Sequence, residues 1–307
     1  MTRVVVAAGL LLAGCVAPSE PLPPRAAAPV PAPPAAAPVP APPQGQVILD
    51  GTPQQGAVLL GFIPPGASDL TLDGRPVPFA DDGRFVLGFD RDAAGTSNLV
   101  ARYPGGSLSR QITIAPRAWR IERVDVPRRP GGATAAFEAI RAPEIARINA
   151  ARAVNAASDG WRQRFQWPST GRISGLFGSQ RIYRGGEPGA YHSGVDVAGG
   201  AGAPVVAPAD GVVVLAADKP FSLEGNLLII DHGMGLNSAF LHLSRINVRE
   251  GQRVKKGQLV GAIGASGRAT GPHLHWAVKW RDARVDPMLL AGPMGSQDLS
   301  KVPMAEN

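Results

Sequence analysis

Residues 271–280 read Gly-Pro-His-Leu-His-Trp-Ala-Val-Lys-Trp, and this stretch decides how the C-terminal half of the chain folds. The run from Leu274 to Trp280 follows a Gly-Pro pair and is rich in apolar and aromatic residues, which predicts a β-strand. Because side chains alternate along a strand, His273 and His275 project from one face while Leu274 packs on the other. Two imidazoles on one face indicate a site, since burying both needs several polar partners.

Similar runs recur throughout residues 166–290, and Gly-bearing turns such as Ala209-Asp210-Gly211 separate them. All five histidines of the chain fall in this region, at positions 192, 232, 242, 273 and 275. The pattern predicts an antiparallel β-sheet or sandwich domain that carries the chemistry. Its expected strands, besides 274–280, are Val205–Val206, Gly211–Ala216, Leu227–Ile230, Ala239–Leu243 and Leu259–Ile263.

A second motif, His192-Ser193-Gly194-Val195-Asp196, places an imidazole and a carboxylate four residues apart. Residues at this spacing share a face in a helix and also in a strand, and the glycines here favour loop and strand. Two histidines and one aspartate form the three-ligand set that catalytic zinc sites use, with the fourth position left to water. The chain holds one cysteine, Cys15, which excludes a thiolate-rich or iron–sulfur site. His242 lies on another expected strand that can face the same cleft.

These motifs resemble the LytM/lysostaphin-like zinc endopeptidases, which cut peptidoglycan peptides. The resemblance covers about residues 167–290. Its motifs are GRISGLFG at 171–178, HSGVD at 192–196, APADG at 207–211, DHG at 231–233, HL at 242–243 and GPHLH at 271–275. It implies that Zn²⁺ binds to His192, Asp196 and His275. It also implies that His242 and His273 form the catalytic pair beside the metal.

The resemblance carries further expectations about individual residues and about the reaction. His232 matches a recurrent position that is not a metal ligand, and we expect it to orient a turn. Phe240 stands where the family commonly has Tyr, which predicts a hydrogen bond missing from the cleft wall. The implied reaction is attack of a metal-activated water on a cross-link peptide bond of peptidoglycan, with a D-Ala-to-diamino-acid bond as the expected target. The alternative is a non-catalytic LytM-type module that binds or activates another cell-wall hydrolase.

The N-terminus has the layout of an export signal. Met1–Arg3 is basic and Val4–Ala13 is apolar but too short to span a bilayer, which predicts a signal peptide over residues 1–14. The end of this run, Leu12-Ala13-Gly14-Cys15, resembles a bacterial lipobox and implies a lipid on Cys15. An ordinary signal with an incidental cysteine is the alternative. The expected location is the periplasmic face of a membrane, with the outer membrane preferred.

Three further segments complete the predicted organisation. Residues 15–45 are rich in Pro and Ala and form a disordered tether, because they lack apolar bulk and backbone donors. Residues 46–126 show short alternating runs between turns, which predicts a small β-sandwich-like domain that serves as a spacer or docks cell-wall or division proteins. Residues 127–165 form a helical connector, expected as two helices (134–141 and 143–157) because Pro143 suits a first helical turn. Residues 291–307 are a tail.

Composition narrows the function classes. The net charge is +7, but the basic residues are scattered and form neither a basic helix nor a stacking motif on a strand, so nucleic-acid binding is not expected. No apolar run after Cys15 approaches the ~20 residues of a membrane-spanning helix. A single cysteine also excludes an intrachain disulfide. The sequence therefore predicts a mainly β, exported, lipid-anchored protein.

Overall fold

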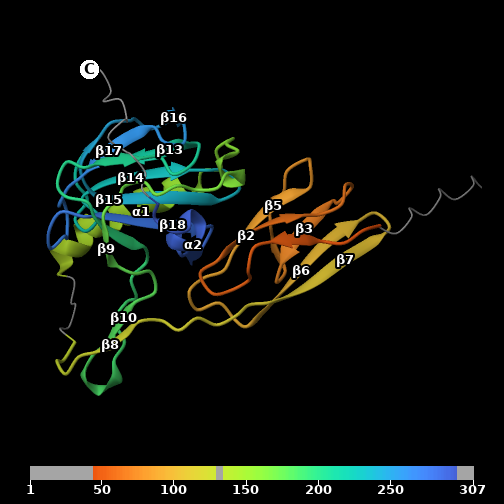
Figure 1. Cartoon of the computed structure of the whole chain (residues 1–307), viewed down its shortest axis with the longest axis horizontal. Helices are drawn as coiled ribbons and strands as arrows, with labels where there is room; N and C mark the ends of the chain where they lie inside the picture. The colour runs from red at the N-terminus through yellow and green to blue at the C-terminus, as the bar shows by residue number, and fades with distance from the viewer. Residues whose placement is uncertain (1–43, 129–133, 296–307) are drawn as a thin grey trace, which may run out of the picture. The chain divides into compact units, whose positions relative to one another are not determined.

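The computed structural model describes residues 44–128 and 134–295 (Figure 1). The expected signal peptide, Cys15, nearly all of the tether and most of the tail lie outside the described residues. No described helix is both long enough and apolar enough to cross a membrane. The strands of the first part are β1 (Ile48–Asp50), β2 (Val58–Phe62), β3 (Asp69–Leu72), β4 (Arg75–Pro76), β5 (Arg84–Gly88), β6 (Thr96–Tyr103), β7 (Gly106–Thr113) and β8 (Ile121–Arg123).

The second part begins with a helix and continues almost entirely as strands, which confirms the mainly β prediction. Its helices are α1 (Ala135–Ala153) and α2 (Pro287–Ala291), with short 3-10 turns at Gly160–Arg162 and Arg184–Gly186. Its strands are β9 (Arg172–Gly175), β10 (Gln180–Ile182), β11 (Val195–Ala198), β12 (Pro204–Val206), β13 (Gly211–Ala216), β14 (Asn226–Asp231), β15 (Leu236–Ile246), β16 (Arg253–Val254), β17 (Leu259–Ile263), β18 (Leu274–Trp280) and β19 (Ala283–Val285).

The small β domain consists of two antiparallel sheets, ordered β1-β2-β5 and β4-β3-β6-β7. Alternating apolar residues of both sheets, among them Leu59, Leu70 and Leu99, are fully buried in one core cluster. Gly61 has no side chain because the ring of its cross-strand partner Phe85 occupies the position that a Cβ would take. This is the sandwich-like domain that the alternating runs predicted.

A large antiparallel sheet forms the scaffold of the second part, in the order β16-β13-β14-β15-β18-β11-β9. Its long central strands β15 and β18 pair so that Leu241 lies opposite His275. On the other side of β18, Asp196 of β11 lies directly opposite the same His275. Cβ atoms of directly opposed residues lie about 5 Å apart, so strand register alone brings this carboxylate to this imidazole.

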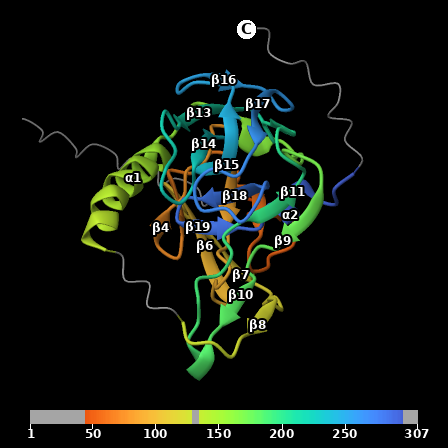
Figure 2. The same ribbon diagram turned by 90° about the vertical axis from the view of Figure 1, so that its left-hand side faces the viewer.

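Helix α1 is one continuous element, and the expectation of two helices was wrong. It runs from the N-cap Thr134, whose side chain accepts from the N–H of Phe137, through Pro143 to Ala153. An interior proline costs a helix about 3 kcal/mol. Here, Arg141 before the proline forms a salt bridge with Glu144 after it (3.0 Å), which spans the interruption in α1. Ile148 and Ala151 bury its apolar face against strands β13 and β14 (Figure 2).

Strand β8 is short and pairs outside the two sheets of the small β domain. β8 pairs in parallel with β10, so that Gln180 lies opposite Ile121. The N–H of His192 donates to the carbonyl of Ser179, directly before β10 (2.8 Å), which ties the His192 loop to this strand pair. Residues Arg120, Glu122 and Arg128 thereby line the same cleft as the histidines, so the end of the segment expected as a spacer contributes to the site.

Candidate metal centre

An open cleft of about 1160 Å³ lies over the face of the large sheet. Four of the five histidines line it, together with Asp196. His232 lies elsewhere, fully buried, where its Nδ1–H donates to the carbonyl of Asp210 (2.8 Å) and its Nε2 accepts from Ser238 (2.9 Å). Burial lowers the pKa of His232 to about 4. His232 therefore holds a turn, as its motif predicted.

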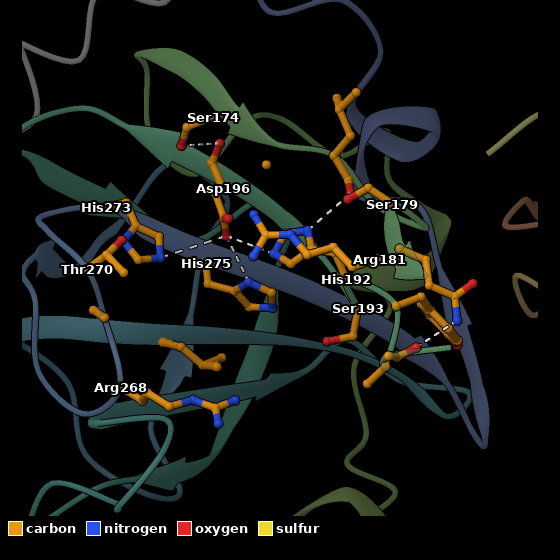
Figure 3. Close-up of a pocket in the computed structure, with 18 of the residues that line it drawn as sticks. Ser174, Ser179, Arg181, His192, Ser193, Asp196, Arg268, Thr270, His273 and His275 are labelled. Atoms are coloured by element: carbon orange, nitrogen blue, oxygen red, sulfur yellow. Dashed lines mark hydrogen bonds and ion pairs between the residues drawn. The ribbon is translucent and has the colours of Figure 1, made fainter. Parts of the chain in front are cut away.

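Three of the expected ligands form one compact group. His192, Asp196 and His275 present ligand atoms that all lie within 4.8 Å of one another. Oδ1 of Asp196 is 3.1 Å from Nε2 of His192 and 2.9 Å from Nδ1 of His275, so the carboxylate lies between the two rings (Figure 3). The centroids of these rings are 4.7 Å apart. The donors come from a loop and two paired strands, and Asp196 and His275 are 79 residues apart in the sequence.

The backbone around the group leaves room only for these side chains. A Cβ at Gly175 would overlap the carboxylate of Asp196, and a Cβ at Gly194 would lie 2.8 Å from Nε2 of His275. The carbonyl of Leu176 lies 3.1 Å from Nδ1 of His192. A carbonyl only accepts, so this Nδ1 carries a proton and Nε2 is the nitrogen that faces the group. This is the orientation that a metal-ligating histidine needs.

The charge balance of the group follows from the same contacts. Burial raises the pKa of the Asp196 carboxyl, but the hydrogen bonds from His192 and His275 outweigh it and hold that pKa far below its usual value. Burial lowers the pKa of His275, whereas the bond to Asp196 outweighs burial at His192 and raises its pKa. Asp196 is thus ionised at neutral pH, and the buried His275 favours its neutral form. An ionised carboxylate and neutral imidazoles are the donors that a divalent cation binds.

The expected catalytic pair lies beside this group. The ring centroids of His242 and His273 are 4.9 Å apart, and Nε2 of His273 is 3.9 Å from Oδ1 of Asp196 (Figure 3). The Nδ1–H of His242 donates to the carbonyl of Ser266 and the Nδ1–H of His273 donates to that of Gly271, each at a distance of 2.8 Å. In the neutral form of each ring, Nε2 is therefore the nitrogen that can accept a proton from a group in the cleft.

An unusual backbone conformation brings His242 into the cleft. Its φ is +63°, in the left-handed region, and its N–H donates to the carbonyl of Glu224 (2.8 Å) instead of continuing the strand ladder. This breaks the alternation of β15, so that Leu241 and His242 both line the cleft. Phe240 points the other way and is fully buried opposite Trp276. The expectation that Phe240 leaves the cleft wall without a hydroxyl was therefore wrong, because its side chain lies in the core.

Several cleft residues escaped sequence reasoning. Arg268 and Thr270 come from the loop between β17 and β18 and lie across the cleft from His192 (Figure 3), while Arg181 lines it from β10. No spacing rule marks a cationic residue on a loop. Two features of the sequence pointed toward these residues. Arg181 follows the GRISGLFG motif at 171–178, and residues 268–270 directly precede the GPHLH motif that contains His273.

Together, fold and site define a β protein with a histidine–carboxylate metal-binding group in an open cleft. The profile of peptidase family M23 matches residues 190–287. A solved structure from Pseudomonas aeruginosa, whose description names peptidase M23, is 30% identical with a TM-score of 0.59, and the match covers 78% of this chain and 95% of that one. The chain belongs to peptidase family M23.

The relatives with assigned activities align with this chain over only part of their own length. The peptidoglycan DD-endopeptidase ShyA of Vibrio cholerae is 40% identical over 134 residues, which are 44% of this chain and 31% of that protein. ShyB of the same organism, also a peptidoglycan DD-endopeptidase, is 44% identical over 97 residues, which are 32% of this chain and 22% of that protein. The chain thus spans less than a third of the length of these two relatives.

Proposed function

We propose that this protein is a zinc-dependent endopeptidase that hydrolyses peptide cross-links of peptidoglycan, with the D-Ala-to-diamino-acid bond as its target. The observation that carries the proposal is the convergence of a three-donor group and a histidine pair in one open cleft. Family membership and the activity of the ShyA and ShyB relatives support the substrate class.

Zinc fits the donor set best. Two imidazole nitrogens and one carboxylate oxygen suit a tetrahedral ion that keeps one position for water, whereas magnesium and calcium prefer an all-oxygen shell. The proposed ligands are His192, Asp196 and His275. When bound there, zinc would supply a coordinated water with a pKa lowered toward ~7 and a positive charge that would polarise the scissile carbonyl.

The chain's own residues supply the proton transfers. Nε2 of His242 and Nε2 of His273 accept a proton from the attacking water or return it to the leaving amine, because the Nδ1–H of each ring is already donated to a carbonyl. Burial lowers the pKa of His242, which keeps that ring neutral and able to accept at neutral pH. Such positioned acid–base groups contribute about 10²–10⁴-fold to rate.

The envelope location is part of the proposal. A signal peptide over residues 1–14, a lipid on Cys15 and a tether over 15–45 would hold the peptidase on the periplasmic face of the outer membrane, within reach of peptidoglycan. The small β domain is the proposed docking module for cell-wall or division proteins. Radiolabelled palmitate tests the anchor: wild type should incorporate the label and Cys15→Ala should not.

The main experiment uses purified, cross-linked peptidoglycan of known structure. Incubation with the zinc-loaded protein should release fragments whose mass spectra show a new D-Ala carboxyl and a new diamino-acid amine. The alternative, a non-catalytic module that activates another hydrolase, predicts bound protein and no released fragments. The zinc content is measured by plasma mass spectrometry on the same sample. A protein that holds stoichiometric zinc and still releases no fragments supports the alternative, whereas low zinc content indicates an enzyme that lacks its metal.

A further inference from the structure

A second, smaller cavity adjoins the cleft. It measures about 280 Å³ and is lined by residues of helix α1 and of the sheet face that carries His275. Ser193, Leu241 and His275 line both cavities, so the smaller one opens from the cleft beside the metal-binding group. A substrate in the cleft can therefore extend a side group into it.

Four cationic residues line this cavity: Arg141, which pairs with Glu224, and three others from three different elements. Arg152 lies in the last turn of α1, Lys279 near the end of β18 and Arg284 in β19. Among the described residues, no carboxylate forms an ion pair with any of the three. The carboxylate that does line the cavity, Glu224, accepts a bidentate pair of bonds from Arg141, both 2.6 Å. The cavity therefore carries an uncompensated positive charge.

The guanidinium of Arg152 shows the cost of this arrangement. Its Nε is buried and lacks a hydrogen-bond partner among the described residues. Burial and, next, the charge of Arg284 lower the pKa of Arg152, while burial followed by the charges of Arg152 and Arg284 lowers that of Lys279. A buried, unpaired cation destabilises the folded state. An anionic ligand that pairs with the three cations relieves this cost.

Strand geometry connects the cations to the metal-binding group. His275, Ala277 and Lys279 alternate onto one face of β18, and all three line the cavity. At about 3.3 Å per residue, Lys279 lies about 13 Å along the strand from His275. The small Ala277 between them leaves the path open. An extended peptide with its scissile bond at His275 therefore brings a group up to about four residues away to the cations.

We propose that this cavity binds a carboxylate of the peptide substrate, with Arg152, Lys279 and Arg284 as its recognition residues. The inference rests on the proposed function, because peptidoglycan stem peptides carry free carboxylates near the cross-link. Planar carboxylates pair well with guanidinium groups, and such charge-assisted hydrogen bonds are the strong ones. Two sources of the carboxylate are available, the peptide C-terminus and the side carboxyl of an acidic or diamino-acid residue.

Equilibrium binding to the full chain tests the proposal. The probes are a fluorescent stem tetrapeptide with free carboxylates, two peptides with either the C-terminal or the side carboxyls amidated, and one fully amidated peptide. Wild type should bind the free peptide roughly ten-fold or more tightly than the fully amidated one. The partly amidated peptide that binds weakly identifies the recognised carboxylate. Equal binding of the free and fully amidated peptides would overturn the proposal.

Variants assign the preference to the cavity. Arg152→Gln and Lys279→Gln should each weaken binding of the free peptide about ten-fold and leave binding of the fully amidated peptide unchanged. Lys219→Gln is the matched control, because Lys219 is an exposed cation that lines neither cavity. If Arg152→Gln and Lys279→Gln retain the wild-type preference, the cations do not read the carboxylate.

Thermal unfolding separates this role from a purely structural one. Arg152→Gln should unfold at the same or a higher temperature than wild type, since it removes a half-buried charge that has no carboxylate partner among the described residues, whereas a structural Arg152 would give a lower temperature. Failure of the proposed function is a distinct result. A protein that prefers free carboxylates but releases no fragments from peptidoglycan retains the binding site and loses only the endopeptidase assignment.

Discussion

Asp196 is the residue on which the candidate metal centre depends, because its Oδ1 contacts both ligand imidazoles. We expect Asp196→Ala and His275→Ala to lose both zinc and hydrolysis, since two donors do not hold the ion. We expect His273→Ala to keep zinc and to lower kcat about 10²-fold or more, because it removes only a proton-transfer group. Metal content and fragment release are measured on the same samples. A fully active His273→Ala protein would refute the role given to His273.

His232 sets a pH dependence of stability that is independent of the metal centre. Its pKa is about 4 in the folded protein against 6.5 for the free side chain, because it is buried. The unfolded chain therefore binds a proton that the folded chain does not between about pH 6.5 and pH 4, and stability falls as pH falls through this window. From pH 7.5 to pH 5, this residue should remove about 2 kcal/mol of unfolding free energy.

Urea unfolding of wild type and His232→Gln at the two pH values measures this effect. The variant starts less stable, because it loses packing against Phe165, but its stability should fall about 2 kcal/mol less on acidification. Other titrating groups contribute equally to both proteins and cancel in the comparison. An identical fall in both proteins would mean that His232 is not kept neutral by burial.

At the scale of elements, helix α1 fixes the loop that positions His242. Arg141 of α1 pairs with Glu224, and the backbone carbonyl of Glu224 accepts from the N–H of His242. Glu144, one turn along, accepts from both the N–H and the hydroxyl of Ser222 (2.6 Å each). The helix expected as part of a connector thus holds the loop that positions His242.

Arg141→Met should therefore reduce activity without removing the metal. The pair is largely buried, at 15% exposure for each side chain, so breaking it should cost about 2–3 kcal/mol of unfolding free energy and lower kcat several-fold. The double variant Arg141→Met/Glu224→Met should recover part of the stability, because Glu224 is no longer an unpaired buried charge, while Glu144 loses Arg141 but keeps its hydrogen bonds from Ser222. The control is Arg147→Met, whose pairs are exposed and worth less than about 1 kcal/mol. Unchanged kcat in Arg141→Met would separate α1 from catalysis.

At the scale of the whole molecule, the small β domain reaches the metal centre through Arg91. This buried guanidinium donates to the carbonyl of Gly178 and to the side-chain Oε1 of Gln180, each at 3.0 Å. It also lies over the ring of Trp119. Gly178 in turn donates its N–H to the carbonyl of His192 (2.9 Å). The loop that carries a ligand is thus tied to the preceding domain, which a simple spacer would not do.

We expect Arg91→Ala to weaken zinc binding as well as stability. Loss of these hydrogen bonds from a buried site should cost about 2–4 kcal/mol of unfolding free energy. The loop around His192 then pays an ordering cost on metal binding, which should raise the zinc Kd about ten-fold or more. Competition with a chromophoric chelator measures that Kd. Wild-type affinity in a folded Arg91→Ala protein would show that the two domains act independently.

The sequence by itself determined most strands of the large sheet and the candidate ligands, because both depend on local patterns. Alternation marks the strands, and the pairs 192/196 and 273/275 put imidazole and carboxylate donors at short spacings. Tertiary structure alone decided the rest. Contacts between distant segments decide the β11–β18 register that brings Asp196 to His275 and the left-handed backbone conformation of His242. They also decide the parallel pairing of β8 with β10, the continuity of α1 through Pro143 and the cationic cavity. Local propensity carries no information about such contacts, because they stabilise the chain only when segments far apart in the sequence pack against each other.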